Sequence, residues 1–244
     1  MLSRKDQKFI KSLKVKKYRS SEKCFLVEGA KNVQELLNSD FQTEIVIGTE
    51  EFFTEKVHMG AQRKEVVKSD LLGQLSTFKT NHDGLAVAKM KDFNRKPIDA
   101  NDHLFALDGV GDPGNLGTII RTLDWFGFTQ IVCSQDCAEF YHPKVINSSM
   151  GSFTRINPYY CLLPKFIADS KLLAFGADMD GDSIHEISLD GPSIFVMGSE
   201  SHGISKEVEK HLESRVSIPR YGKAESLNVA MAAGIIASHL RTSK

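Results

Sequence analysis

The sequence predicts an α/β protein in which a small N-terminal layer of strands and helices precedes a larger C-terminal one. Short apolar runs alternate with stretches of helical periodicity, and this alternation occurs twice along the 244 residues. Several of the later apolar runs have no polar position, which is typical of parallel strands covered by helices on both faces. A charged stretch without periodicity, at residues 91–99, separates the two alternating segments.

The first segment is expected to form a small α/β domain. Strands are predicted at residues 23–29, 43–48, 64–67 and 84–90, and helices at 30–39 and 71–76. The stretch that follows contains Pro97 and several charges, so we interpret it as a connection. We therefore assign residues 1–92 to the first domain, 93–102 to a linker and 103–244 to the second domain.

The second segment is expected to form a parallel sheet. Strands are predicted at residues 103–107, 130–133, 172–177, 193–198 and 216–219, and helices at 115–126, 205–213 and 226–240. In the first of these helices, apolar residues recur at the spacing of one helical face. Arg121 points nearly opposite that face, with Trp125 one turn further on. Arg121 is therefore either a solvated side chain or part of a subunit contact.

Charge is distributed unevenly, although the net charge of the chain is zero. Residues 1–23 carry nine Lys and Arg against two acidic residues, a net charge of +7, so the other 221 residues sum to −7. A basic arm on an acidic body indicates contact with a polyanion, most simply a nucleic acid.

The cysteines and the hydropathy indicate the compartment. Four cysteines are too few and too scattered for a disulfide framework and suit a reducing environment. No apolar run approaches the ~20 residues that span a bilayer, and the N-terminus has no apolar secretory segment. We expect a cytoplasmic protein. Cys133, Cys137 and His142 lack an evident fourth ligand, and Cys133 lies in a predicted strand, so we expect no metal.

Residues 109–114 match the glycine pattern of dinucleotide-binding proteins, G-x-G-x-x-G. The pattern follows a predicted strand and opens a predicted helix, and Asp136 lies near the end of the next strand. However, Pro113 removes one of the backbone N–H groups that would hold a pyrophosphate. We therefore prefer a tight turn, with Pro113, Gly114 and Asn115 providing the turn and the helix cap.

Three blocks, at residues 108–127, 193–205 and 216–240, carry further polar residues beside predicted strands. The second places Glu200 in a glycine-rich bend after an apolar strand, where α/β proteins bind ligands. The third contains a helix, expected to begin at Ser226, that is small or apolar on nearly all sides, so protein should surround it. Taken alone, Ser226 and Asn228 are helix caps or ligand contacts.

In this order, the three blocks resemble the signature motifs of the SPOUT superfamily, in its SpoU/TrmH branch of tRNA and rRNA 2′-O-ribose methyltransferases. The matching residues are Asn115-Leu116-Gly117 with Arg121, Gly198-Ser199-Glu200 with Gly203, and Ile218-Pro219 with Ser226-Leu227-Asn228-Val229-Ala230. The resemblance covers residues 103–242. Residues 12–37 resemble, less sharply, the accessory RNA-binding domain of this branch, which is related to a ribosomal-protein fold.

The resemblance implies a C-terminal domain with a deep trefoil knot, S-adenosylmethionine as the methyl donor, RNA as the substrate, and a homodimer with its active site at the subunit interface. It implies catalytic or site roles for Asn115, Arg121, Glu200, Ser226 and Asn228. It also implies a cofactor site, built largely from main-chain groups, at Met197, Gly198, Ser199, Glu200, Gly203, Ile218, Ser226, Leu227 and Asn228.

The arginine of the first motif has been proposed in the family as a general base. A guanidinium with a pKa above ~12 rarely gives up its proton. We therefore hypothesise that Arg121 clamps a phosphate of the target and stabilises the developing alkoxide.

Beside an RNA-modifying domain, the basic arm is expected to contact RNA through Lys14, Lys16, Lys17 and Arg19, which surround Tyr18. The accessory domain favours ribosomal RNA over transfer RNA. Arg220 stands where the family more often has an apolar residue and Ala230 where it often has serine, which leaves substrate preference open. Two alternatives are a knotted RNA-binding protein without catalysis and an NAD-binding oxidoreductase. The complete set of site residues argues against the first, whereas the second predicts NAD binding at residues 109–114 and no affinity for S-adenosylmethionine.

Overall fold

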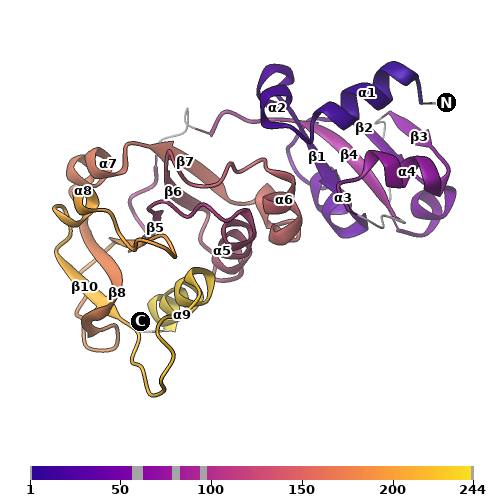
Figure 1. Ribbon diagram of the computed structural model, residues 1–244. Helices are drawn as coiled ribbons and strands as arrows, with labels where there is room; N and C mark the ends of the chain where they lie inside the picture. Colours follow the sequence, from indigo (N-terminus) through magenta and orange to yellow (C-terminus); the bar gives the residue numbers. More distant parts are fainter. Residues whose placement is uncertain (1, 57–62, 79–82, 94–97, 243–244) are drawn as a thin grey trace. The chain divides into compact units, whose positions relative to one another are not determined.

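The computed structural model describes residues 2–56, 63–78, 83–93 and 98–242 (Figure 1). The chain folds into two compact units, Met1–Asp92 with Phe140–Thr154, and Phe93–Glu139 with Arg155–Lys244. The first unit thus includes a segment, Phe140–Thr154, that the sequence pattern assigns to the second domain. Of the expected linker, residues 94–97, including Pro97, lie outside the described residues.

A four-stranded sheet with the order β1-β4-β2-β3 forms the centre of the first unit. Its strands are β1 (Cys24–Glu28), β2 (Thr43–Gly48), β3 (Lys64–Val66) and β4 (Gly84–Lys89), which confirms all four predicted strands. The helices are α1 (Arg4–Ser12), α2 (Lys16–Glu22), α3 (Ala30–Leu37), α4 (Ser69–Leu75) and α6 (Pro143–Ser149), with short π- and 3₁₀-helical turns at Phe52–Lys56 and Ser152–Thr154. The basic arm is therefore helical, which the apolar pattern did not indicate.

The second unit contains a six-stranded sheet with the order β10-β8-β9-β5-β6-β7, in which every pair is parallel. The strands are β5 (Leu104–Leu107), β6 (Gln130–Ser134), β7 (Asn157–Cys161), β8 (Leu173–Ser183), β9 (Ser193–Met197) and β10 (Ser214–Ser217). Helices α5 (Pro113–Trp125), α7 (Leu163–Ser170), α8 (Lys206–Glu209) and α9 (Val229–Thr242) accompany the sheet. The parallel arrangement confirms the predicted fold class, whereas the trefoil knot stays a prediction.

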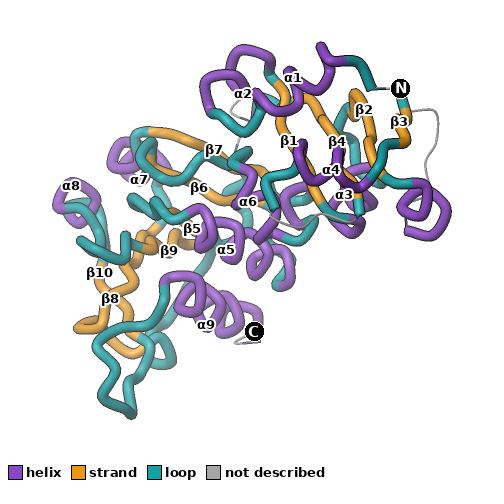
Figure 2. Tube along the Cα trace, turned by 45° about the vertical axis from the view of Figure 1, so that its right-hand side comes forward, coloured by secondary structure: helices purple, strands orange, loops and turns teal. Residues whose placement is uncertain are grey.

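Both faces of the parallel sheet are covered, as its apolar strands require. Leu104, Ala106 and Val196 pack in one core with Leu163 of α7 and Val208 of α8. The intervening residues of the strands point to the opposite face, where α5 and α9 lie side by side (Figures 1 and 2). No helix in the described residues is long and apolar enough to cross a membrane.

Helix α9 differs from its prediction in two respects. It begins at Val229 rather than Ser226, because Asn228 ends the preceding loop and its side-chain oxygen accepts the amide N–H of Ala230 at 2.9 Å. It is also not surrounded on all sides within this chain: Ala233 and Ile236 are buried, but Met231 is 60% exposed. One side of this apolar helix is therefore open for another surface.

The C-terminal end of α9 is fixed to the sheet by Arg241. Its guanidinium forms two hydrogen bonds with the Asp102 carboxylate, at 2.9 and 2.6 Å, and a third with the Phe126 carbonyl at 2.8 Å. It also lies 3.9 Å from the centre of the Phe128 ring. Burial raises the pKa of Asp102, but the hydrogen bonds from Arg241 and the His103 amide outweigh it, so the pKa lies below its usual range. These contacts hold α9, whose N-terminal end directly follows Asn228.

Candidate active site

Three loops meet at the C-terminal ends of the parallel strands, where open α/β sheets bind ligands. They follow β5, β9 and β10. Strands β5 and β9 are neighbours in the sheet, and a buried carboxylate ties their loops together. The Asp108 amide donates to the Met197 carbonyl at 2.9 Å, and the Asp108 carboxylate accepts the Ser205 amide at 2.7 Å. Asp108 is only 7% exposed, so this connection is shielded from water.

One polar side chain from each motif joins a hydrogen-bonded triangle. The Asn115 side-chain N–H donates to Glu200 Oε1 at 2.6 Å, and the Asn228 side-chain N–H donates to the same oxygen at 3.0 Å. The Asn228 amide also lies 3.0 Å from Asn115 Oδ1. Two amides thus fix the orientation of one accessible carboxylate, although the three residues are far apart in sequence. Below, these residues are called the Asn-Glu-Asn triangle.

The bend that presents Glu200 depends on a glycine at position 198. Ser199 and Gly203 exchange two main-chain hydrogen bonds of 2.9 Å, and Gly203 adopts a positive φ of 66°. This closes the bend so tightly that a Cβ added to Gly198 would lie 2.3 Å from the Gly203 carbonyl carbon. A side chain at position 198 therefore requires the bend to open.

Replacing Gly198 with alanine is therefore expected to weaken binding of S-adenosylhomocysteine, the demethylated form of the cofactor that the resemblance implies, by about tenfold or more. Calorimetric titration measures this affinity, and a melting curve shows that the variant is folded. Gly191→Ala is the matched control, because a Cβ at Gly191 meets no atom within 4 Å. Equal affinities of Gly198→Ala and wild type would show that the closed bend does not shape the pocket.

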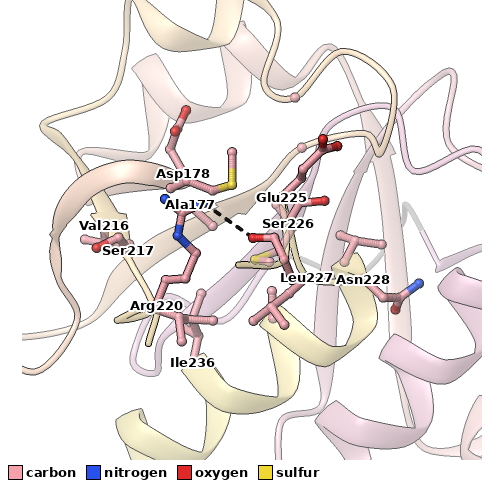
Figure 3. Close-up of a pocket in the computed structure, with 18 of the residues that line it drawn as sticks. Ala177, Asp178, Val216, Ser217, Arg220, Glu225, Ser226, Leu227, Asn228 and Ile236 are labelled. Carbon is pink, nitrogen blue, oxygen red and sulfur yellow. Dashed lines mark hydrogen bonds between the residues drawn. The ribbon is translucent and has the colours of Figure 1, made fainter. Parts of the chain in front are cut away.

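A pocket of about 670 Å³ lies between the loops after β9 and β10 and the start of α9 (Figure 3). Its volume falls in the range of sites for cofactor-sized molecules. The nine residues expected to bind the cofactor all line it: Met197, Gly198, Ser199, Glu200, Gly203, Ile218, Ser226, Leu227 and Asn228. The lining also includes Asp178, Glu225 and Arg220. Because Asp178 pairs with Arg215 at 3.2 Å, the carboxylates of Glu200 and Glu225 remain against the Arg220 guanidinium. This excess of negative charge suits a cationic ligand such as a sulfonium compound.

Arg121 lies apart from the triangle within this chain. It is on the exposed side of α5, six residues after Asn115. Six residues correspond to about 9 Å along a helix and about 240° around it. Because Asn115 points to Glu200, Arg121 must point elsewhere. Trp125 follows one turn later and is 84% exposed. Ser226, the remaining expected catalytic residue, lines the pocket two positions before Asn228.

The basic arm presents only part of the expected RNA-contacting set. Lys16 and Lys17 are exposed on α2, whereas Lys14 is half-buried and donates to the Ser76 carbonyl at 2.5 Å. The structure contradicts the expected RNA contact of Arg19. Its side chain is 1% exposed, and its guanidinium donates to the carbonyls of Leu13 and Lys14 at 3.0 and 2.9 Å. Arg19 joins the end of α1 to α2 instead.

Cys133, Cys137 and His142, which were considered above as metal ligands, are buried or form hydrogen bonds within the protein. Cys133 and Cys137 are buried, and the Cys137 thiol donates to the Leu107 carbonyl at 3.2 Å. Hydrogen bonding with the Cys133 thiol lowers the pKa of Cys137 to about 7, against the opposing effect of burial. His142 instead caps α6 by accepting the Lys144 amide. Among the described residues, no three His, Cys, Asp or Glu side chains are grouped so as to hold a metal ion.

Sequence reasoning missed several residues of the site. Asp108 directly follows β5, so its position at a strand end was a usable signal. Asp178 and Met179 line the pocket because β8 continues to Ser183, well past the apolar run that predicted it. Tyr221 and Glu225 lie in the loop before α9, where no periodicity marks them.

A parallel sheet with a cofactor-sized pocket and an oriented carboxylate at its C-terminal edge is typical of an α/β enzyme. Residues 102–238 match the SpoU rRNA Methylase family, and residues 6–86 match the MRM3-like substrate binding domain. The chain belongs to the SpoU rRNA methylase family. This confirms the predicted family and, with it, the RNA methyltransferase class and the S-adenosylmethionine cofactor.

Relatives and solved structures are similar over nearly the whole chain. RlmP of Bacillus subtilis, a 23S rRNA guanosine 2′-O-methyltransferase, is 30% identical over 236 residues, covering 95% of this chain and 94% of the relative. A Porphyromonas gingivalis protein assigned to the TrmH family of RNA methyltransferases is 34% identical, with a TM-score of 0.89 over 100% of both chains. The methyltransferase AviRb of Streptomyces viridochromogenes, in complex with AdoMet, shares the fold at 23% identity, with a TM-score of 0.86 and 97% coverage of each chain.

Proposed function

We propose that this protein transfers a methyl group from S-adenosylmethionine to a ribose 2′-hydroxyl of ribosomal RNA, as a cytoplasmic homodimer. The Asn-Glu-Asn triangle carries the proposal, because it places one oriented carboxylate beside a cofactor-sized pocket. The 2′-O-methylation of 23S rRNA by a relative that aligns over nearly the whole chain supports ribosomal RNA as the substrate.

The pocket residues can hold this cofactor without a dedicated charged clamp. Main-chain groups around Met197, Gly198, Ile218 and Leu227 are available for the uncharged adenine, whose edges need only neutral donors and acceptors. Glu200 and Glu225 line the same pocket, and their negative charges favour a positive charge there, whereas the Asp178 carboxylate pairs with Arg215 at 3.2 Å. When bound, the cofactor supplies an electrophilic methyl group on a cationic sulfur.

The chain's own residues then align and activate the acceptor hydroxyl. Glu200 Oε1 is held by two amides, so the carboxylate is oriented before substrate arrives. A carboxylate is suited to accept the hydrogen bond of a ribose hydroxyl and the proton that leaves it. Alignment alone is worth about 7–11 kcal/mol in well-oriented systems. Arg121 of a second subunit clamps the neighbouring phosphate and stabilises the developing alkoxide.

The homodimer is supported by the apolar side chains that α5, α9 and the loop before α9 leave open. Trp125 is 84% exposed, Met231 60% and Leu227 50%. Helices α5 and α9 pack against each other, so these side chains lie on adjoining elements. Large apolar side chains on adjoining elements are typical of a subunit interface. Such an interface would bring Arg121, which shares α5 with Trp125, towards the partner's site.

Methylation of unmodified RNA tests the proposed function directly. The wild-type protein, with tritiated S-adenosylmethionine, is expected to label an unmodified 23S rRNA transcript at one ribose, which then resists alkaline hydrolysis at its 3′ phosphodiester. A transfer RNA pool is the comparison substrate. Mapping of ribose methyl groups in a deletion strain identifies the nucleotide. Label in a base, or in transfer RNA alone, would contradict the proposal.

The first unit is proposed to hold the RNA through the exposed cations of α1 and α2. Replacing both Lys16 and Lys17 with glutamine is expected to weaken RNA binding. The dependence of log affinity on log salt concentration should then decrease by about 0.7 to 0.9 per lysine. Lys68→Gln with Lys165→Gln removes the same charge from two other exposed positions and should leave the slope unchanged. Equal slopes of the two double variants would count against this surface.

A further inference from the structure

The loop between β10 and α9, residues 218–228, projects from the second unit (Figures 1 and 2). All of its residues from 220 to 228 are exposed. Tyr221 is 97% exposed. A fully exposed tyrosine presents both faces of its ring to solvent, so the ring is accessible to a binding partner.

Tyr221 lies at the border of the cofactor pocket. It lines the same pocket as Glu200 and Asn228, the two members of the Asn-Glu-Asn triangle that border it. The pocket walls leave its ring almost entirely uncovered, so the ring is free to receive a planar group arriving from outside. The target ribose must approach this border to reach Glu200, which places its neighbouring nucleotides near Tyr221.

Two cations flank this tyrosine on an otherwise acidic body. Arg220 and Lys223 are both exposed, whereas residues 24–244 sum to a net charge of −7. The Arg220 guanidinium donates to the Ala224 carbonyl at 3.4 Å, a contact that spans the segment with Tyr221 and Lys223. Figure 3 shows Arg220 beside the pocket. A tyrosine that lies between two cations in sequence matches a single-stranded RNA segment, whose bases stack and whose phosphates are anionic.

We propose that Tyr221 stacks on a base adjacent to the target ribose, while Arg220 and Lys223 hold the flanking phosphates. This inference rests on the proposed function, because it requires RNA at the pocket. It assigns Arg220, Tyr221 and Lys223 a role in substrate recognition, beside the roles in cofactor binding and subunit contact proposed for other residues of the same loop. The stacking needs the ring and not the hydroxyl group, so the phenylalanine and tryptophan variants should retain it.

The test compares Tyr221→Ala, Tyr221→Phe and Tyr221→Trp with wild type, using an unmodified 23S rRNA transcript. Tyr221→Ala should raise the KM for RNA and the Kd for RNA about ten- to a hundredfold. The Phe and Trp variants should stay within about threefold of wild type, since both retain a face for stacking. Lys223→Gln should lower the salt dependence of RNA binding by about 0.7, whereas Tyr221→Ala should not.

Two further readouts separate the possible roles of Tyr221. S-adenosylhomocysteine affinity and sedimentation should be unchanged in Tyr221→Ala. A loss of S-adenosylhomocysteine affinity as large as the loss of RNA affinity would assign the ring to the cofactor site. A changed mass of the assembly in sedimentation would assign the ring to the subunit interface. Either result overturns the inference, and so does an unchanged RNA affinity. Failure of wild type to methylate the transcript would instead count against the proposed function, and RNA binding by Tyr221→Ala and wild type would still decide the role of the ring.

Discussion

Replacing Glu200 with glutamine is expected to lower the single-turnover rate of methyl transfer by about 10²- to 10⁴-fold, the usual contribution of a positioned acid or base. Glutamine has the same shape and keeps an oxygen that accepts the hydrogen bonds of Asn115 and Asn228. The change therefore removes the negative charge and little else. Measuring the rate at saturating cofactor and RNA excludes effects on binding.

The control for this change is Glu207→Gln, which removes a carboxylate from the exposed surface of α8. It should retain the wild-type rate. A further variant, Asn115→Ala, leaves Glu200 charged but removes one of the amides that orient it, and a loss of about 10²-fold is expected. A rate for Glu200→Gln within threefold of wild type would show that the carboxylate neither accepts the proton nor aligns the hydroxyl.

Arg121→Lys is expected to lower the single-turnover rate by about 10²- to 10³-fold, as loss of a donor to a developing oxyanion does. Lysine keeps the positive charge but cannot form the planar, two-pronged contact of a guanidinium with a phosphate. If Arg121 is a clamp, the shape of the rate–pH profile should be the same in both proteins. A proton-accepting role would instead make the rate of the lysine variant rise towards the pKa of an amine, about 10.

Near-wild-type activity of Arg121→Lys would remove any need for the planar group and leave only charge as the contribution of this residue. S-adenosylhomocysteine affinity should not change, because Arg121 is outside the residues that line the pocket. Sedimentation of the variant shows whether the subunits still associate.

Much of the second unit could be predicted from the sequence, because its strands are apolar throughout and its motifs adjoin the strand ends. β7 escaped prediction because Pro158 and two tyrosines break its apolar pattern. The strand tolerates proline because it lies at the edge of the sheet. The strand predicted at residues 172–177 also ends too early. β8 continues through Asp178 and Asp180, which lie beyond its apolar part.

Contacts between distant residues could not be predicted from local pattern. Arg19 looks like any other cation of the basic arm, and only the folded chain shows that carbonyls from the turn after α1 enclose it. Likewise, when each member of the Asn-Glu-Asn triangle is considered alone, it is interpreted as a helix cap or a loop residue. The family resemblance predicted that Asn115, Glu200 and Asn228 belong to one site. The spacing of these residues in the sequence does not predict this.

In the proposed homodimer, Glu200 of one subunit and Arg121 of its partner form one active site. Mixing Arg121→Ala subunits with Glu200→Gln subunits, after reversible dissociation, tests it most directly. Each protein alone should be nearly inactive. If the subunits pair at random, half of the dimers are mixed and each has one intact site, so about a quarter of wild-type activity should return. A mixture that stays as inactive as its components would show that the site is not shared between subunits.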